Sequence, residues 1–275
     1  MQFLLRFLQI LSYPFLAVEF IFRFLSALNK SRKYVKNPDN YPADSRFKSV
    51  YILASRIRYF KGIKIIEKGI ENIPKKKPVL FVANHKSNLD AIVLLNVINH
   101  HKEIESLVTF VAKKELLKKS VGKILRLIDC VFIDREMSRK AIEEAVAALE
   151  AQKNHIRSNV SLGIFSEGTR VPGDKLGEFK GASIKVAYKT FSQIIPAAIY
   201  GTEGKMDHSL ASNGKPFNKI KGRKVYIEFL KPVMPINIMN IESNKLVANI
   251  RNDIQSAYLR LKKEHETPKS KKKDK

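Results

Sequence analysis

The chain has 275 residues, 44% of them hydrophobic, which is enough for a sizeable core in one large domain or two small ones. Its 51 Lys and Arg residues outnumber 26 Asp and Glu residues, and the formal net charge of +25 favours anionic partners: nucleic acid, an anionic lipid surface, a phosphorylated substrate or an acidic carrier protein. The single cysteine, Cys130, excludes an internal disulfide and gives no reason to expect an oxidising compartment.

The first 60 residues are expected to form a membrane-associating helical segment and a connector. The longest uncharged run, residues 7–18, contains Pro14 and is shorter than the roughly 20 apolar residues that a bilayer-spanning helix needs. Polar side chains share one face of this helix: Arg6, Gln9, Ser12, Glu19, Arg23, Ser26 and Lys30. The Phe-rich remainder and the basic stretch "KSRKYVK" favour a helix lying on an anionic membrane, with packing against the protein's own domain as the alternative.

Residues 61–263 are expected to form an α/β domain, preceded by a helix over residues 46–60. Short runs rich in β-branched residues predict strands at residues 63–67, 79–83, 107–112, 130–133, 160–165, 194–200 and 225–230. Helical patterns separate several of them, most clearly over residues 138–153 and 244–263. This alternation predicts a β-sheet flanked by helices, whereas residues 264–275 are basic, lack an apolar face and predict a disordered tail.

The heptapeptide "NHKSNLD", residues 84–90, interrupts two apolar runs at a predicted strand end, where α/β folds bind ligands. Histidine has an unperturbed pKa near 6.5, so a neutral His85 can take a proton from a hydroxyl, and Asp90 can orient the ring and stabilise the imidazolium. The alternative is structural, because Ser87 and Asp90 have the spacing of a helix capping box.

A second polar segment, "SEGTR", follows the predicted strand at residues 160–165. Gly168 lets the backbone approach a ligand closely, and Arg170 offers a planar fork of donors for phosphate oxygens. Glu167 can accept from a hydroxyl or hold the arginine. Alternatively, the segment is a turn in which Glu167 and Arg170 form a surface ion pair.

Further candidates lie at other strand ends. "AKKEL" supplies Lys113 and "VFIDR" supplies Arg135, although solvated surface residues are expected in so basic a chain. "FKGAS" places Lys180 at the start of a possible helix, a geometry suited to anions. Pro196 interrupts an apolar strand pattern, which is typical of an edge strand or a bulge near a site.

In this order, "NHKSNLD", "VFIDR", "FSEGTR" and "IIPAAI" resemble the four ordered motifs of the glycerolipid acyltransferase family, specifically the bacterial 1-acyl-sn-glycerol-3-phosphate acyltransferases, over residues 62–232. The resemblance implies a mixed β-sheet flanked by helices. It also implies transfer of a fatty acyl group from an acyl thioester to the sn-2 hydroxyl of 1-acyl-sn-glycerol 3-phosphate, giving phosphatidate at the cytoplasmic face of the cell membrane. Acyl-CoA or acyl carrier protein would be the co-substrate, without a metal or a further cofactor.

The resemblance also implies roles for individual residues. His85 would be the general base and Asp90 its partner, and the Pro196 segment would shape the acyl or acceptor pocket. The implied substrate-binding residues are Lys113, Arg135, Glu167, Gly168, Thr169, Arg170 and Lys180. Two departures from the family pattern stand out: Ser166 replaces a frequent Pro, and Asp129 or Cys130 replaces a frequent Gly.

Three alternatives stay open at the level of sequence. The acceptor could be glycerol 3-phosphate or another lysophospholipid. A non-catalytic basic protein that binds anionic membrane is the alternative of a different class. Nucleic acid is disfavoured, because aromatic residues concentrate in the N-terminal helix and do not interleave with Lys and Arg. Cys130 could suggest an acyl-enzyme, but its apolar strand predicts a buried small hydrophobe.

Overall fold

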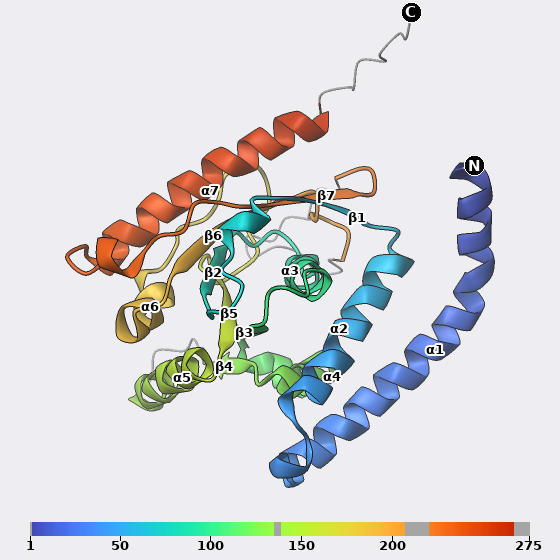
Figure 1. The fold of residues 1–275 in the computed structure, drawn as a ribbon, viewed down its shortest axis with the longest axis horizontal. Helices are drawn as coiled ribbons and strands as arrows, with labels where there is room; N and C mark the ends of the chain where they lie inside the picture. The colour runs from blue at the N-terminus through green and yellow to red at the C-terminus, as the bar shows by residue number, and fades with distance from the viewer. Residues whose placement is uncertain (1, 135–138, 207–219, 267–275) are drawn as a thin grey trace, which may run out of the picture. The chain divides into compact units, whose positions relative to one another are not determined.

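The structure is a computed structural model that describes residues 2–134, 139–206 and 220–266 (Figure 1). The chain divides into two compact units. The first comprises residues 1–63, 75–78 and 92–163, and the second comprises residues 64–74, 79–91 and 164–275. Each unit is described by itself below.

The first unit is mainly helical. Its helices are α1 (Gln2–Lys36), α2 (Ala43–Phe60), most of α3 (Leu89–His100), α4 (Ser120–Leu125) and α5 (Arg139–Arg157), with short 3₁₀ turns at Pro38–Asn40, Lys114–Lys118 and Arg126–Ile128. Strand β3 (Leu107–Lys113) pairs in parallel with β4 (Val131–Ile133) and with β5 (Val160–Phe165). In α5 the apolar stripe expected at Ala145, Val146 and Leu149 is not the buried face: Ala145 and Val146 are exposed and Leu149 is half-buried, whereas Ala148 is buried.

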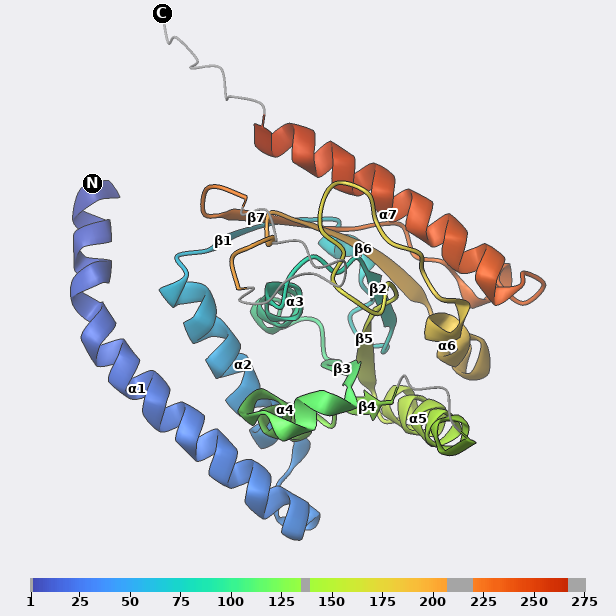
Figure 2. The same cartoon turned by 180° about the vertical axis from the view of Figure 1, so that it is seen from behind.

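Helix α1 runs beside α2 in both views (Figure 1, Figure 2) and continues unbroken through Pro14. Its polar face packs against α2: Glu19 accepts hydrogen bonds from Arg56 Nε and Nη2 at 2.6 and 2.8 Å, and Lys30 Nζ donates to Ser49 at 2.9 Å. The opposite face leaves large apolar side chains exposed: Phe15, Val18, Ile21, Phe22 and Leu25. Within the part of the chain that the structure describes, every helix is too short or too polar to cross a membrane.

Asp129, at one of the two departures from the family pattern, anchors both N-terminal helices. Its backbone is left-handed, with φ at 49°, the conformation for which glycine is the usual residue. The carboxylate accepts hydrogen bonds from Tyr34 Oη at 2.5 Å and from the buried Arg46 guanidinium at 2.8 Å. The backbone strain is therefore offset by contacts that no glycine can make.

The second unit contains a mixed sheet. Its strands are β1 (Lys64–Lys68), β2 (Leu80–Ala83), β6 (Ile194–Tyr200) and β7 (Lys224–Phe229), in the order β1, β7, β6, β2. The β1–β7 and β2–β6 pairs are parallel and the β6–β7 pair is antiparallel. The unit also holds α6 (Lys185–Thr190), α7 (Ser243–Glu266) and 3₁₀ turns at Ile70–Asn72, Gly181–Ile184 and Pro235–Asn237. Helix α7 packs against β6 through the predicted apolar stripe: Leu246, Ile250, Ile254, Tyr258 and Leu261 are buried.

All the predicted strands form, each within one residue of the expected ends. The expectation that Pro196 marks an edge strand is wrong, because β6 has β2 on one side and β7 on the other. Pro196 lies just beyond the β6–β7 pairs, which begin at Ala197 and Phe229, and its carbonyl accepts from Leu230 N at 2.8 Å. Antiparallel pairing continues past Pro196 at the Ile194–Val233 bridge, but its register is shifted by one residue, which fits the bulge that was the other half of the expectation. A proline is tolerated at such a position.

Candidate active site

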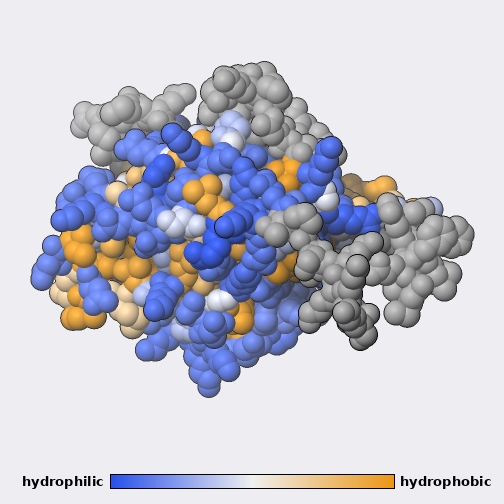
Figure 3. Space-filling model, turned by 90° about the horizontal axis from the view of Figure 1, so that it is seen from above, coloured by the Kyte–Doolittle hydropathy of each residue, from blue (hydrophilic) through white to orange (hydrophobic). Residues whose placement is uncertain are grey.

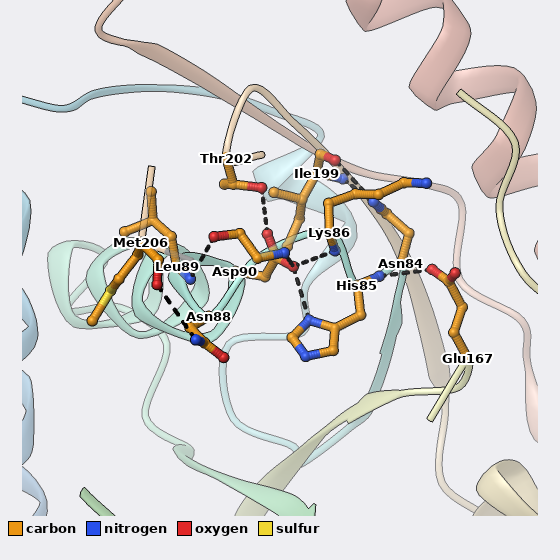
Figure 4. Close-up of polar contacts among 11 residues, drawn as sticks. Asn84, His85, Lys86, Asn88, Leu89, Asp90, Glu167, Ile199, Thr202 and Met206 are labelled. Carbon is orange, nitrogen blue, oxygen red and sulfur yellow. Dashed lines mark hydrogen bonds and ion pairs between the residues drawn. The ribbon is translucent and has the colours of Figure 1, made fainter. Parts of the chain in front are cut away.

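The site begins where the buried strand β2 ends at Ala83 (Figure 4). The Asn84 amide donates to the Ile199 carbonyl at 2.9 Å and accepts from Ile199 N at 2.8 Å, so this side chain takes over the pairing with β6. The main chain is thereby free to turn away from the sheet. His85 lies on the turn, four residues before α3 begins at Leu89.

His85 and Asp90 meet as the sequence predicts. Nδ1 of His85 lies 2.9 Å from Oδ2 of Asp90, whose side chain is fully buried. Because a carboxylate can only accept, Nδ1 of the neutral ring carries the proton and Nε2 keeps its lone pair. Nε2 hydrogen-bonds to none of the described residues, and the ring stacks on Phe165 with centroids 4.3 Å apart. This is the arrangement of a general base.

Asp90 also makes the capping contacts of the structural alternative. Its Oδ2 accepts from the backbone N–H groups of Lys86 and Ser87 at 2.7 and 2.8 Å. Its Oδ1 accepts from the Thr202 hydroxyl at 2.6 Å. One carboxylate therefore caps the start of α3 and orients His85. Thr202 was not among the predicted residues, and the signal that could have found it is a polar residue directly after the apolar strand β6.

Glu167 lies behind His85 and is only 5% exposed, so it is not part of a surface ion pair. Its two oxygens accept from the backbone N–H groups of His85 and Gly177, each at 2.8 Å. Burial raises the pKa of the Glu167 carboxyl. Val171 N also donates to the His85 carbonyl at 3.1 Å. The loop of residues 166–180, here called the β5 loop, is thus tied to the histidine, and Arg170 lies half-buried within it.

A buried lysine that the sequence did not single out fastens the same loop. Lys86 is 1% exposed and donates from Nζ to the carbonyls of Gly173 and Lys175 at 2.7 and 3.0 Å. Its Nζ also lies 5.3 Å from the ring centroid of Tyr258 on α7. Glu203, itself buried, accepts from Gly173 N at 2.9 Å. Burial lowers the pKa of Lys86 and raises that of Glu203, and the opposite charges counter both shifts.

Lys180, Ser166, Gly168 and Thr169 lie near the two ends of the β5 loop. Lys180 is exposed at the start of the Gly181–Ile184 turn, and its backbone N–H donates to Ser166 O at 3.1 Å. Ser166 uses its hydroxyl to accept from Ser183 at 2.8 Å, a contact that proline at this position lacks. Gly168 has φ at 70° in the turn after β5, and Thr169 is half-buried.

Four further residues from the sequence analysis are Pro196, Lys113, Arg135 and Cys130. Pro196 pairs in register with Val82, three positions before His85. Lys113 is exposed at the end of β3 in the first unit, and Arg135 lies outside the described residues. Cys130 is buried as predicted, and its Sγ donates to the Phe110 carbonyl at 3.1 Å. Burial raises the pKa of its thiol far above its ordinary range, so it is a poor nucleophile.

Comparison with known proteins places this site in a family. The acyltransferase family model matches residues 64–200. Proteins named probable 1-acyl-sn-glycerol-3-phosphate acyltransferase from Mycoplasma genitalium and Mycoplasma pneumoniae are 44% and 40% identical, and each match covers 94% of this chain and 94% and 95% of those proteins. The crystal structure of the 1-acyl-sn-glycerophosphate (LPA) acyltransferase PlsC from Thermotoga maritima matches with a TM-score of 0.65 and 26% identity, covering 95% of this chain and 98% of that one. The chain belongs to the acyltransferase family.

Proposed function

We propose that this protein transfers a fatty acyl group from an acyl thioester to the sn-2 hydroxyl of 1-acyl-sn-glycerol 3-phosphate, forming phosphatidate and a free thiol. The observation that carries the proposal is the His85–Asp90 pair, with Nδ1 held at 2.9 Å and Nε2 directed away from the carboxylate (Figure 4). The names of the mycoplasma relatives support the choice of acceptor.

In the proposed reaction, Nε2 of His85 takes the proton of the acceptor hydroxyl as its oxygen attacks the thioester carbonyl. Asp90 stabilises the imidazolium that forms. The tetrahedral intermediate then collapses, the carbon–sulfur bond breaks, and the leaving thiolate takes the proton back from His85. The enzyme needs no nucleophile of its own.

Arg170 is the proposed ligand of the acceptor phosphate, because its guanidinium suits phosphate oxygens and its loop is bonded to the backbone of His85. Glu167 supports the site from behind, since backbone donors occupy both of its oxygens. Gly168, Thr169 and Lys180 complete the proposed substrate-binding set of the second unit. The roles that the resemblance implies for Lys113, Arg135 and Pro196 stay predictions. The donor is a thioester of coenzyme A or of acyl carrier protein, both of them anionic.

We propose in addition that α1 holds the protein on the cytoplasmic face of an anionic membrane. Its polar side chains face α2, and its exposed apolar face includes Phe15 at 80% and Phe22 at 69% exposure. Aromatic side chains on one face of a helix insert into the boundary between headgroups and acyl chains. The face seen in Figure 3 is mostly hydrophilic. The attraction to anionic headgroups follows from the net charge of +25.

The test is a donor and acceptor matrix with purified protein in anionic vesicles. We expect phosphatidate from 1-acyl-sn-glycerol 3-phosphate, and slower or no reaction with glycerol 3-phosphate or lysophosphatidylcholine. His85→Ala should abolish turnover while vesicle binding stays unchanged and the protein remains folded, because Asp90 keeps its bonds to two backbone N–H groups and to Thr202. A His85→Ala variant with near wild-type turnover would refute the mechanism, and a wild-type protein that binds vesicles without acylating any acceptor would favour the non-catalytic alternative.

A further inference from the structure

The turn that follows β6 contains Thr202, a buried threonine without a role in the reaction proposed above. Gly201 has φ at 93°, and a Cβ at this position would lie 2.9 Å from the Lys224 carbonyl, so the turn requires glycine. The chain then directs Thr202 back toward the start of α3 (Figure 4). Thr202 is fully buried, and its hydroxyl donates to Oδ1 of Asp90 at 2.6 Å.

The two oxygens of Asp90 have different surroundings. Oδ2 receives His85 Nδ1 and the backbone N–H groups of Lys86 and Ser87, whereas the hydrogen bond found for Oδ1 among the described residues is that from Thr202. The terminal torsion of an aspartate side chain is broad, so contacts to one oxygen fix that oxygen without fixing the plane of the carboxylate. Because both Asp90 and Thr202 are fully buried, water does not replace the hydroxyl.

We propose that Thr202 is a positioning residue for acyl transfer: its hydroxyl fixes the plane of Asp90, which in turn aims Nε2 of His85 at the acceptor hydroxyl. This inference rests on the proposed function of His85. It differs from a purely structural role, in which Thr202 would only fasten the β6 turn to α3 and would affect folding without affecting the chemical step.

The test compares Thr202→Val, which removes the hydroxyl at constant volume, with Thr202→Ser, which keeps it. Thr109→Val is the matched control, because Thr109 on β3 is fully buried and its hydroxyl has no hydrogen-bond partner in the described part of the chain. For each variant kcat, KM for 1-acyl-sn-glycerol 3-phosphate and the melting temperature are measured in the same vesicles.

We expect Thr202→Val to lower kcat by about 10- to 100-fold with KM within about twofold, because the loss falls on orientation and not on substrate binding. Thr202→Ser should restore most of kcat, and Thr109→Val should match the wild type. A Thr202→Val variant with wild-type kcat, or a Thr202→Ser variant as slow as Thr202→Val, would overturn the inference.

A double variant separates positioning from folding. If Thr202 acts only through His85, then adding Thr202→Val to His85→Ala should change the residual rate by less than about twofold, since residues of one catalytic unit are not additive. An equal loss in both backgrounds would assign Thr202 a structural role. A wild-type protein without acyltransferase activity would instead defeat the proposed function, whereas active wild type, inactive His85→Ala and fully active Thr202→Val would defeat this inference alone.

Discussion

Replacing the buried lysine of the β5 loop tests how the site is held together. Lys86→Met keeps the length and most of the volume of the side chain but removes the ammonium group. The variant loses the hydrogen bonds at 2.7 and 3.0 Å to two loop carbonyls and the contact with the Tyr258 ring at 5.3 Å. It also deprives the buried carboxyls of Glu167 and Glu203 of the positive charge that helps to lower their pKa values.

Removing one partner from a buried charged group costs about 3–5 kcal/mol, which here includes the lost hydrogen bonds to a charged donor. We therefore expect Lys86→Met to lower the free energy of unfolding by that amount. The melting temperature should fall by about 10 °C, given about 2–4 °C per kcal/mol in larger domains. Urea unfolding followed by far-ultraviolet circular dichroism gives the free energy, with the exposed Lys231→Met as the control.

The double variant Lys86→Met/Glu203→Gln makes the test sharper, because glutamine keeps an oxygen that can accept from Gly173 N but removes the buried charge. Its loss should be smaller than the sum of the two single losses by at least about 1 kcal/mol. Strict additivity, or a Lys86→Met variant within about 1 kcal/mol of the wild type, would refute the view that this cluster is electrostatically coupled.

Three further predictions concern the first unit. The pKa of Glu19 is lowered to about 2 by its bonds to arginines on α2 and α1, so its stabilisation is complete above its ordinary value of 4.5 and is lost as the pH falls toward 2. Glu19→Gln should therefore cost about 1 kcal/mol at pH 7 and much less at pH 2, where about half of the Glu19 carboxyls are protonated in the folded state, as thermal melts at both pH values would reveal. Asp129→Gly should lower the free energy of unfolding by about 2 kcal/mol, because the buried Arg46 loses its carboxylate although backbone strain is relieved; a more stable variant in urea titrations would contradict this. Phe22→Asp should weaken binding to anionic vesicles by about 10-fold or more at an unchanged melting temperature, whereas Phe191→Asp, at 64% exposure in the second unit, should not; equal loss in flotation assays would argue against α1 as the membrane contact.

Local patterns predicted the elements, because each depends on neighbours in the chain. The β-branched runs became strands, and the spacing in "NHKSNLD" brought His85 to Asp90, since both lie at one strand-to-helix turn. Thr202 and Lys86 escaped prediction for the opposite reason. Thr202 reaches Asp90 only because β6 lies beside β2, and Lys86 reaches carbonyls 87 and 89 positions away in sequence. A strand order and a loop path are not contained in any short window of sequence.

Two positions depart from general rules of local structure. Proline within a strand usually marks an edge, yet Pro196 lies in an interior strand, at the point where the antiparallel register shifts by one residue. Glycine usually occupies a left-handed backbone position, yet Asp129 is placed there because its carboxylate binds Arg46 and Tyr34. At both positions, contacts with residues distant in sequence determine which amino acid fits the local backbone conformation.

The way α1 divides its two faces governs how the purified protein will behave. Glu19 and Lys30 bind α2 and therefore do not shield the exposed apolar face of α1. Phe15 and Phe22 are exposed to solvent. Without lipid or detergent, these aromatic side chains can be buried only by self-association of the protein. The oligomeric state measured by size-exclusion chromatography should therefore depend on the detergent concentration.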